Sequence, residues 1–239
     1  MKMIRIFMIR CGMLTVVLLF LFGLIWGGTF LWNRLTTDGE EQTFAGASVI
    51  EQPETFPKGK PRIMIDAGHG GKDQGTSAGN VLEKDLNLQV AEKLAKELKK
   101  RGASVLLTRT DDTKIPLEER AAMANEKEAD LFVSIHCNYC EDDSSVQGLE
   151  CYYREESDEA QKLAENVVTA VEESSMISCR GTRTADFSVL RNTSMTAVLV
   201  EIGYLSNSSE RQNLGRKDYQ QELIDRLADG ILMENGETS

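Results

Sequence analysis

Short apolar runs alternate with longer segments of helical periodicity from residue 62 onward, and this alternation limits the folds open to the chain. Apolar runs of four to eight residues between polar ones are typical of buried strands, and apolar residues every three to four positions are typical of amphipathic helices. The predicted strands are 63–67, 103–108, 131–136, 148–153, 187–190 and 197–202, and the predicted helices are 82–102, 117–129, 157–174 and 219–233. This order predicts an α/β fold, with a mostly parallel or mixed central sheet flanked by helices in a single domain. The sequence Asn207-Ser-Ser-Glu210 resembles a capping box and predicts a further helix start.

The two histidines of the chain each follow an apolar run, His69 in Ile-Asp-Ala-Gly-His and His136 in Val-Ser-Ile-His. Glu83 follows the first histidine after a glycine-rich loop, and Glu201 ends the apolar run Ala-Val-Leu-Val. Because ligand sites in such sheets lie outside the carboxyl ends of the strands, we expect these side chains to meet there. Two histidines and one glutamate with an open fourth position form a known catalytic zinc set. The sequence therefore predicts a zinc site of His69, Glu83 and His136, with Glu201 free to act as a base.

Each of these residues also has a structural interpretation. A histidine after a strand can be a hydrogen-bonded core group, and Glu83 can favour a helix N-terminus through the helix dipole. Glu201 can be an ion-pair partner. Four further polar residues are candidates for orienting the ligands or positioning a substrate, and each can instead serve the fold; they are Asp66, Asp73, Arg120 and Asn138.

The N-terminal region is uncharged over residues 11–33, about the roughly 20 residues that a membrane-spanning helix needs. Basic residues precede this segment, so the positive-inside rule puts the N-terminus in the cytoplasm and the remaining chain outside the cell membrane. We expect residues 1–34 to form a cytoplasmic N-terminus with a single-pass anchor, residues 35–60 an extracytoplasmic linker, and residues 61–239 the folded domain. A cleaved signal peptide is the alternative, although its apolar core is shorter, at about 7–15 residues.

The charge of the chain disfavours one class of partner. Four of the 27 basic residues lie in residues 1–34, which leaves 23 against 38 acidic residues in the exported part, a net charge of about −15. Nucleic acid binding calls for a basic stripe, so we expect no nucleic acid partner.

Five cysteines leave several possibilities open. Cys11 lies in the apolar segment, and the other four lie in the folded domain: Cys137, Cys140, Cys151 and Cys179. They can be small apolar core residues or form one local disulfide, and Cys137-x-x-Cys140 after His136 makes a cysteine-ligated metal conceivable.

Four motifs together resemble the zinc-dependent N-acetylmuramoyl-L-alanine amidases. They are Ile-Asp-Ala-Gly-His-Gly-Gly, Leu-Glu-Lys-Asp, Ser-Ile-His-Cys-Asn and Val-Glu-Ile-Gly-Tyr-Leu-Ser-Asn, in the family's order. By motif, His69, Glu83 and His136 match the zinc ligands and Glu201 matches the catalytic glutamate. The sequence departs from the family's usual pattern at two places. Small residues are usual after His136, and a proline is usual at the position of Met195-Thr196. Both departures concern loop shape near the metal.

The resemblance implies a metal-dependent hydrolase that cuts the amide between muramic acid and L-alanine of peptidoglycan, with residues 61–239 as its catalytic domain. The anchored single-domain layout is similar to the amidases that form muramic-δ-lactam in spore cortex, some of which need an activating lipoprotein partner. The segment 137–147 is too short for the autoinhibitory helix that some relatives carry there.

Two other functions stay open at this stage. One is a catalytically silent wall-binding scaffold on the same fold, which would have lost a ligand or the counterpart of Glu201. The other is a zinc peptidase that cuts within the stem peptide, which shares the metal set and differs in its products.

Overall fold

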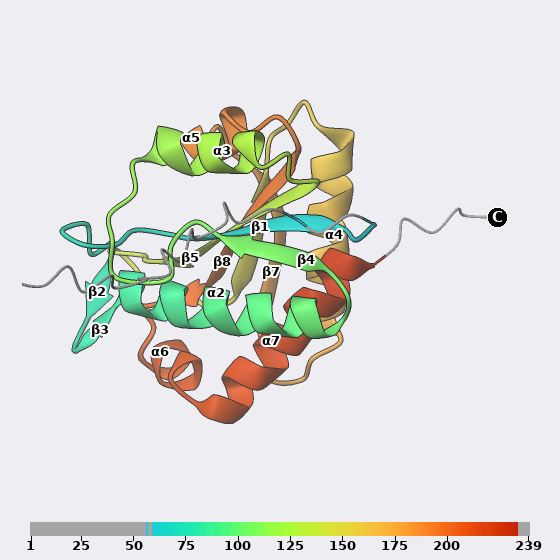
Figure 1. Ribbon diagram of the computed structural model, residues 1–239. Helices are drawn as coiled ribbons and strands as arrows, with labels where there is room; N and C mark the ends of the chain where they lie inside the picture. Colours follow the sequence, from blue (N-terminus) through green and yellow to red (C-terminus); the bar gives the residue numbers. More distant parts are fainter. Residues whose placement is uncertain (1–55, 57–58, 234–239) are drawn as a thin grey trace, which may run out of the picture. The chain divides into compact units, whose positions relative to one another are not determined.

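The computed structural model describes residue 56 and residues 59–233 (Figure 1). A six-stranded sheet in the order β4-β1-β5-β8-β6-β7 forms the centre. Its strands are β1 (Arg62–Ala67), β4 (Ser104–Leu107), β5 (Leu131–Asn138), β6 (Leu149–Tyr153), β7 (Cys179–Thr184) and β8 (Thr196–Tyr204). The helices are α2 (Glu83–Lys100), α3 (Leu117–Glu126), α4 (Asp158–Glu172), α5 (Ser188–Arg191), α6 (Ser208–Leu214) and α7 (Lys217–Leu232). The predicted α/β fold with a mixed sheet is confirmed.

The sheet brings the carboxyl ends of three central strands to one edge. Strands β4, β1, β5 and β8 are parallel, whereas β6 runs antiparallel to β8 and β7 runs parallel to β6. In this register His136 of β5 pairs with Glu201 of β8, and Glu201 pairs in turn with Glu150 of β6. Functional side chains that are far apart in sequence therefore lie on neighbouring strands.

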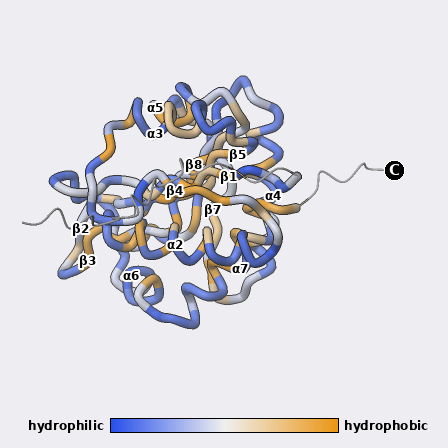
Figure 2. The backbone as a smooth tube through the Cα atoms, viewed as in Figure 1, coloured by the Kyte–Doolittle hydropathy of each residue, from blue (hydrophilic) through white to orange (hydrophobic). Residues whose placement is uncertain are grey.

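Two apolar layers cover the sheet, and strand alternation decides which side chain enters which layer. Helices α2, α4 and α7 pack on one face, against residues such as Val198 and Val200. Helices α3 and α5 lie on the other face, where the smaller core contains Phe132 and Leu199 (Figure 1). Figure 2 shows the apolar strands between helices whose outer sides are hydrophilic. Because Glu201 is two residues from Leu199, its side chain belongs to the face of α3 and α5.

Helix α2 follows directly from its sequence pattern. Leu86, Val90, Leu94 and Leu98 recur every four residues and are all buried. Acidic residues occupy the first turn and basic residues the last, which complements the helix dipole. The helix consequently fixes its first residue, Glu83, at the edge of the sheet.

Two local expectations need correction, and two further elements were not predicted. Residues 187–190 form the start of the short helix α5 instead of a strand, and β7 was not predicted because Arg, Gly and Thr dominate it. The hairpin of β2 (Ser77–Ala78) and β3 (Val81–Leu82) is too short to leave a pattern. Asn207 caps α6, but the Glu210 carboxylate accepts the backbone N–H of Gly148 and Tyr204 rather than closing a capping box.

The predicted anchor at 11–33 lies outside the described residues, as does most of the linker at 35–60. Among the helices of the described part, none combines the length and apolar character that crossing a membrane requires.

Candidate metal centre

His69 lies two residues beyond β1, in a loop with an unusual backbone. Its φ is +60°, a left-handed conformation that is uncommon for residues other than glycine and that clusters at functional sites. Arg120 of α3 donates Nη2 to the His69 carbonyl oxygen over 2.7 Å, which stabilises this conformation. Asp73 Oδ1 lies 2.9 Å from His69 Nδ1 and fixes the orientation of the ring. The other ring nitrogen, Nε2, is thereby directed at Glu83.

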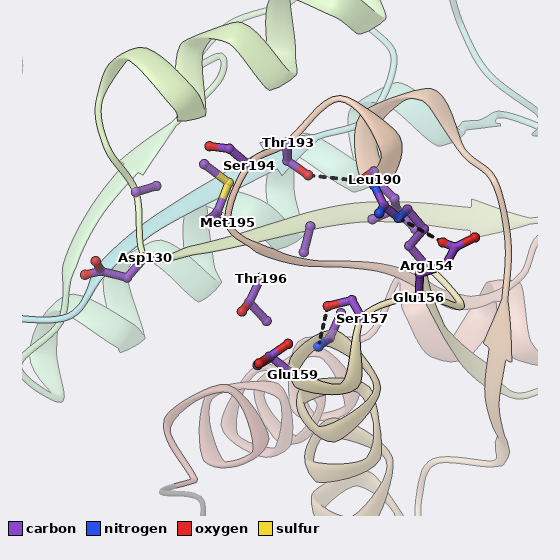
Figure 3. A pocket seen from close by; sticks show the side chains of 13 residues that line it. Asp130, Arg154, Glu156, Ser157, Glu159, Leu190, Thr193, Ser194, Met195 and Thr196 are labelled. Atoms are coloured by element: carbon purple, nitrogen blue, oxygen red, sulfur yellow. Dashed lines mark hydrogen bonds and ion pairs between the residues drawn. The ribbon is translucent and has the colours of Figure 1, made fainter.

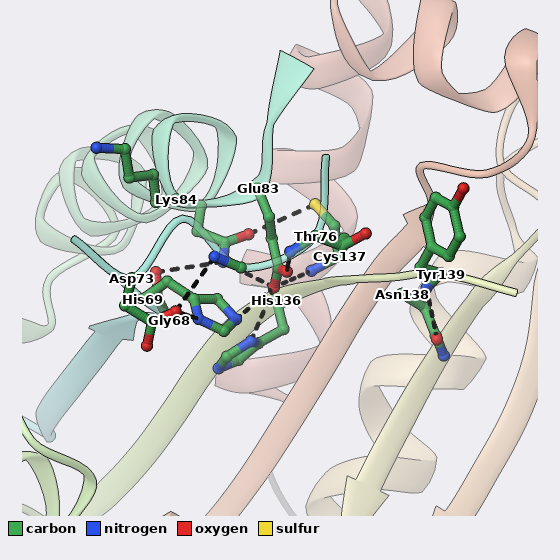
Figure 4. A network of polar contacts seen from close by, with 12 residues as sticks. Gly68, His69, Asp73, Thr76, Glu83, Lys84, His136, Cys137, Asn138 and Tyr139 are labelled. Carbon is green, nitrogen blue, oxygen red and sulfur yellow. Dashed lines mark hydrogen bonds and ion pairs between the residues drawn. The ribbon is translucent and has the colours of Figure 1, made fainter. Parts of the chain in front are cut away.

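Glu83 lies between the two imidazoles (Figure 4). Its Oε1 is 3.1 Å from His69 Nε2 and 3.0 Å from His136 Nδ1. Three further donors hold the same carboxylate: the backbone N–H of Thr76, the backbone N–H of Cys137 and Nδ2 of Asn87. Burial raises the pKa of Glu83, but hydrogen bonds from His136 and His69 outweigh burial and hold it well below its ordinary value. Glu83 is therefore a fixed anion at neutral pH.

His69, Glu83 and His136 fit a divalent metal. Each offers one ligand atom, and these atoms lie within 4.8 Å of one another. Two imidazoles and one carboxylate are a donor set that zinc prefers, and this set leaves a position open for water or substrate. Two glycines keep space around the donors, because a Cβ on Gly68 would collide with the His136 ring and a Cβ on Gly75 would collide with Glu83 and His69. Alanine is thus excluded at both positions without movement of a donor.

Glu201 lies beside this donor set without being part of it. It pairs with His136 across β5 and β8. Among the described residues, its Oε2 is the one buried side-chain oxygen or nitrogen without a hydrogen-bond partner. Burial raises the pKa of Glu201 to about 7, with Glu83 and Glu150 adding to the rise and the two histidines opposing it. A carboxylate of this kind can exchange a proton near neutral pH.

Asp66 and Arg120 hold the loop after β1 that carries His69. Asp66 is fully buried and accepts hydrogen bonds from Arg120, Thr108 and Ser134, each over 2.7 Å. Arg120 also donates to the carbonyl oxygens of Ala67 and His69. Of the two roles that the sequence left open for Asp66, its contacts are those of the structural one, because it acts on the loop through Arg120 and does not contact a histidine ring. Of the two aspartates proposed to orient a histidine ring, Asp73 makes the contact.

Asn138 is engaged within the protein at the rim of the site. Its Oδ1 accepts the backbone N–H of Tyr139, and its Nδ2 lies 3.2 Å from Glu150 Oε2. The exposed Tyr139 follows it directly (Figure 4). The contacts of Asn138 are those of a structural hydrogen-bonding residue.

Sequence reasoning missed Glu150, which faces Glu201 across β6 and β8. Its carboxylate is buried and accepts from Arg180 and Arg183 over 2.8 Å each. A lone acid in the apolar run Gly-Leu-Glu-Cys-Tyr-Tyr was the available signal, but its arginine partners lie in a strand that the sequence did not reveal.

One cavity lies elsewhere and does not contain these residues. It has a volume of about 800 Å³ and lies at the start of β5 and β8, lined among others by Asp130, Arg154 and Thr196 (Figure 3). His136 and Glu201 lie toward the opposite, carboxyl ends of the same two strands. Ligand sites in α/β sheets form outside the carboxyl ends of the strands, which favours the donor set over this cavity.

The cysteines of the folded domain are free thiols. Cys137, Cys140, Cys151 and Cys179 form no disulfide, and none joins the group of potential metal ligands in the described residues. Burial raises the pKa of the Cys137 and Cys151 thiols, which keeps them protonated. Cys137 and Cys151 are therefore small buried core residues, one of the possibilities that the sequence left open.

Comparisons with known proteins agree with this geometry. Residues 63–233 match the family model described as N-acetylmuramoyl-L-alanine amidase. The uncharacterized protein YqiI of Bacillus subtilis (strain 168) is 37% identical over 84% of this chain and 96% of its own length. The probable cell wall amidase LytH of Staphylococcus aureus is 36% identical over 71% of this chain, which spans 56% of LytH.

Solved structures show the same likeness. An N-acetylmuramoyl-L-alanine amidase from Clostridium difficile 630 superimposes with a TM-score of 0.70 at 39% identity, over 72% of this chain and 95% of that one. The CwlD amidase of Clostridioides difficile, solved in complex with the GerS lipoprotein, superimposes with a TM-score of 0.65 at 28% identity, over 71% and 95%. The chain therefore belongs to the N-acetylmuramoyl-L-alanine amidase family, whose members are hydrolases that act on the peptidoglycan of the cell wall.

Proposed function

We propose that the protein cuts the amide between N-acetylmuramic acid and L-alanine by a zinc-dependent reaction, with His69, Glu83 and His136 as the zinc ligands. The observation that carries this proposal is the convergence of these three donors beside Glu201, whose Oε2 is buried without a partner. Zinc in such a site polarises the amide carbonyl and acidifies water. The silent scaffold is disfavoured because the three donors and Glu201 are all retained.

Residues of the chain account for the orientation of the donors and for proton transfer. Asp73 holds the His69 ring, and Arg120 holds the His69 backbone, so that the donors are preorganised. Glu201 accepts a proton from the attacking water and delivers it to the departing amine of L-alanine. Burial brings the pKa of Glu201 to about 7, and the charge of a bound zinc ion would lower it, which favours the ionised form that accepts the proton.

We further propose that the domain works outside the cell membrane, tethered by residues 11–33. The uncharged length of this segment and the basic residues before it support the proposal. A role in spore cortex, with formation of muramic-δ-lactam and an activating lipoprotein partner, is supported by the likeness to CwlD, which was solved in complex with a lipoprotein. N-terminal sequencing of the mature protein tests the anchor: a start near Ser48 would mean that the segment is cleaved.

Mass spectrometry of the products from purified peptidoglycan tests the reaction itself. The amidase reaction releases peptides that begin with L-alanine and leaves glycan strands with free lactyl groups, and a zinc chelator abolishes both products. Peptides that lack L-alanine at their N-terminus would instead identify a peptidase acting within the stem. Purified cortex and vegetative wall, digested in parallel, distinguish the two substrates.

A further inference from the structure

A cationic cluster lies beside the proposed catalytic residues, on strands β6 and β7. Arg180 and Arg183 of β7 each donate Nε to Glu150 Oε1 over 2.8 Å. The second oxygen of Glu150 accepts hydrogen bonds from the hydroxyls of Tyr152 and Tyr204, over 2.8 and 3.0 Å. The buried carboxylate therefore fixes the position of both guanidinium groups.

The two arginines have binding capacity that the fold does not use. A guanidinium has five N–H donors, and in the described residues only the Nε of each arginine has a hydrogen-bond partner. The side chains of Arg180 and Arg183 are 37% and 45% exposed. One arginine would neutralise Glu150, so the second leaves a local excess of positive charge on a chain whose formal net charge is −11.

The cluster lies at a distance that a bound peptide can span. Glu201 of β8 pairs with Glu150 of β6, and β7 is the next and outermost strand. Adjacent strands are about 4.8 Å apart, so the arginines of β7 lie roughly 10 Å across the sheet from β8. An extended peptide advances about 3.3 Å per residue and covers this distance in about three residues.

We propose that Arg180 and Arg183 form a subsite that binds a free carboxylate on the peptide part of the substrate, two to three residues beyond the scissile amide. The planar terminal N–H groups of arginine match the two oxygens of a carboxylate. The Cζ atom of Arg180 lies over the Tyr204 ring, 5.8 Å from the ring centroid, and this contact helps hold the guanidinium in place. The proposal rests on the proposed function, and it makes the charge of the stem peptide a determinant of substrate choice.

A pair of synthetic muramoyl peptides tests this subsite. The two differ only in carrying free carboxylates or carboxamides at the residues beyond L-alanine. We expect the wild-type protein to cut the carboxylate form with a kcat/KM about 10-fold higher, since hydrogen bonds to charged groups are worth about this factor. Arg183→Gln removes most of this preference through KM and leaves the zinc content unchanged, whereas Arg183→Lys, which keeps the charge, retains part of it.

Arg154→Gln is the matched control, because Arg154 is similarly exposed (42%) and also pairs with a glutamate, at the opposite end of β6. Its substrate preference equals that of the wild type. Equal kcat/KM for both peptides in the wild type would overturn the proposal. An equal loss of kcat/KM for both peptides in Arg183→Gln would also overturn it, because Arg183 would then serve only as a counterion of Glu150.

Binding of the free stem peptides, measured by calorimetry without any cleavage, separates this inference from the proposed function. The carboxylate peptide binds the wild type more tightly than the carboxamide peptide does, and Arg183→Gln removes the difference. If the preference in binding holds while neither muramoyl peptide is cut, the subsite stands and the proposed reaction fails. If both are cut without any preference in binding, the reaction stands and the subsite fails.

Discussion

Glu150 and Glu201 face each other on neighbouring strands, yet the protein surrounds their carboxylates in opposite ways. Burial raises the pKa of Glu150, but bonds from Arg180, Tyr152, Arg183 and Tyr204 outweigh it and bring the pKa to about 2. Glu201 has a buried oxygen without a donor, and burial raises its pKa to about 7. The same residue type thus becomes a fixed anion in one region and a group with a raised pKa in the other, according to the donors supplied.

The largest effect is expected at the metal ligands, on the Glu201 side of this comparison. His136→Ala removes one of three donors and should weaken zinc retention by roughly 10-fold or more, by analogy with losses from ligand-supporting groups. Amide hydrolysis falls by about 10³-fold or more, because the metal supplies several kcal/mol of charge stabilisation. Elemental analysis and product release measure the two effects. Cys140→Ala is the control and retains zinc; equal zinc content in wild type and His136→Ala would contradict the ligand assignment.

A smaller effect is expected at Asp73, which contacts the His69 ring and is not one of the three proposed zinc ligands. Asp73→Asn keeps the shape of the side chain but weakens its hold on His69 Nδ1, so zinc affinity falls by about 10- to 100-fold. Competition with a chelator of known affinity measures this change. Asp186→Asn alters an exposed surface ion pair and should leave the affinity unchanged. An unchanged affinity in Asp73→Asn would mean that the loop alone orients the ring.

Glu150→Gln tests the fixed-anion side of the comparison through stability. Losing charged hydrogen bonds to a buried carboxylate should lower the free energy of unfolding by about 1–3 kcal/mol. Since the pKa of Glu150 is depressed, its contribution is present above the unfolded value of about 4.3 and is lost as pH falls toward 2. Urea unfolding at pH 7 and pH 3 measures both effects, and the difference between variant and wild type narrows at the lower pH. Glu173→Gln, at an exposed pair with Arg226, is the control with little effect at either pH.

The smallest effect is expected in the pH dependence of kcat/KM, through which the charge of Glu150 acts on Glu201. Glu201 accepts a proton only when ionised, so kcat/KM should fall about tenfold per pH unit below its pKa. Glu150→Gln removes a negative charge that raises the pKa of Glu201, and the acid limb should therefore move to lower pH, by about one unit or less. An acid limb that moves to higher pH would contradict the proposed coupling.

Much of this arrangement could be predicted from the sequence, because apolar periodicity fixes both the strands and the residues that end them. The runs before His136 and Glu201 predicted two strands whose pairing places these side chains together, and the pattern in α2 predicted where Glu83 begins a helix. The hydrogen-bond donors that surround Glu150, and that Glu201 lacks at its buried oxygen, could not be predicted. It depends on β7, a partly exposed edge strand whose polar sequence has no alternation to reveal it, and on contacts between residues about 30 positions apart.

Glu201→Gln tests the central claim most directly, with zinc content and amide hydrolysis measured on the same preparation. The substitution keeps the shape of the side chain and removes its basicity. We predict that zinc stays bound at the wild-type level while hydrolysis falls by about 10²- to 10⁴-fold, the usual contribution of a general acid–base group. Loss of zinc together with activity would make Glu201 a ligand, and retention of activity would assign proton transfer to another group; either result contradicts the role proposed for Glu201.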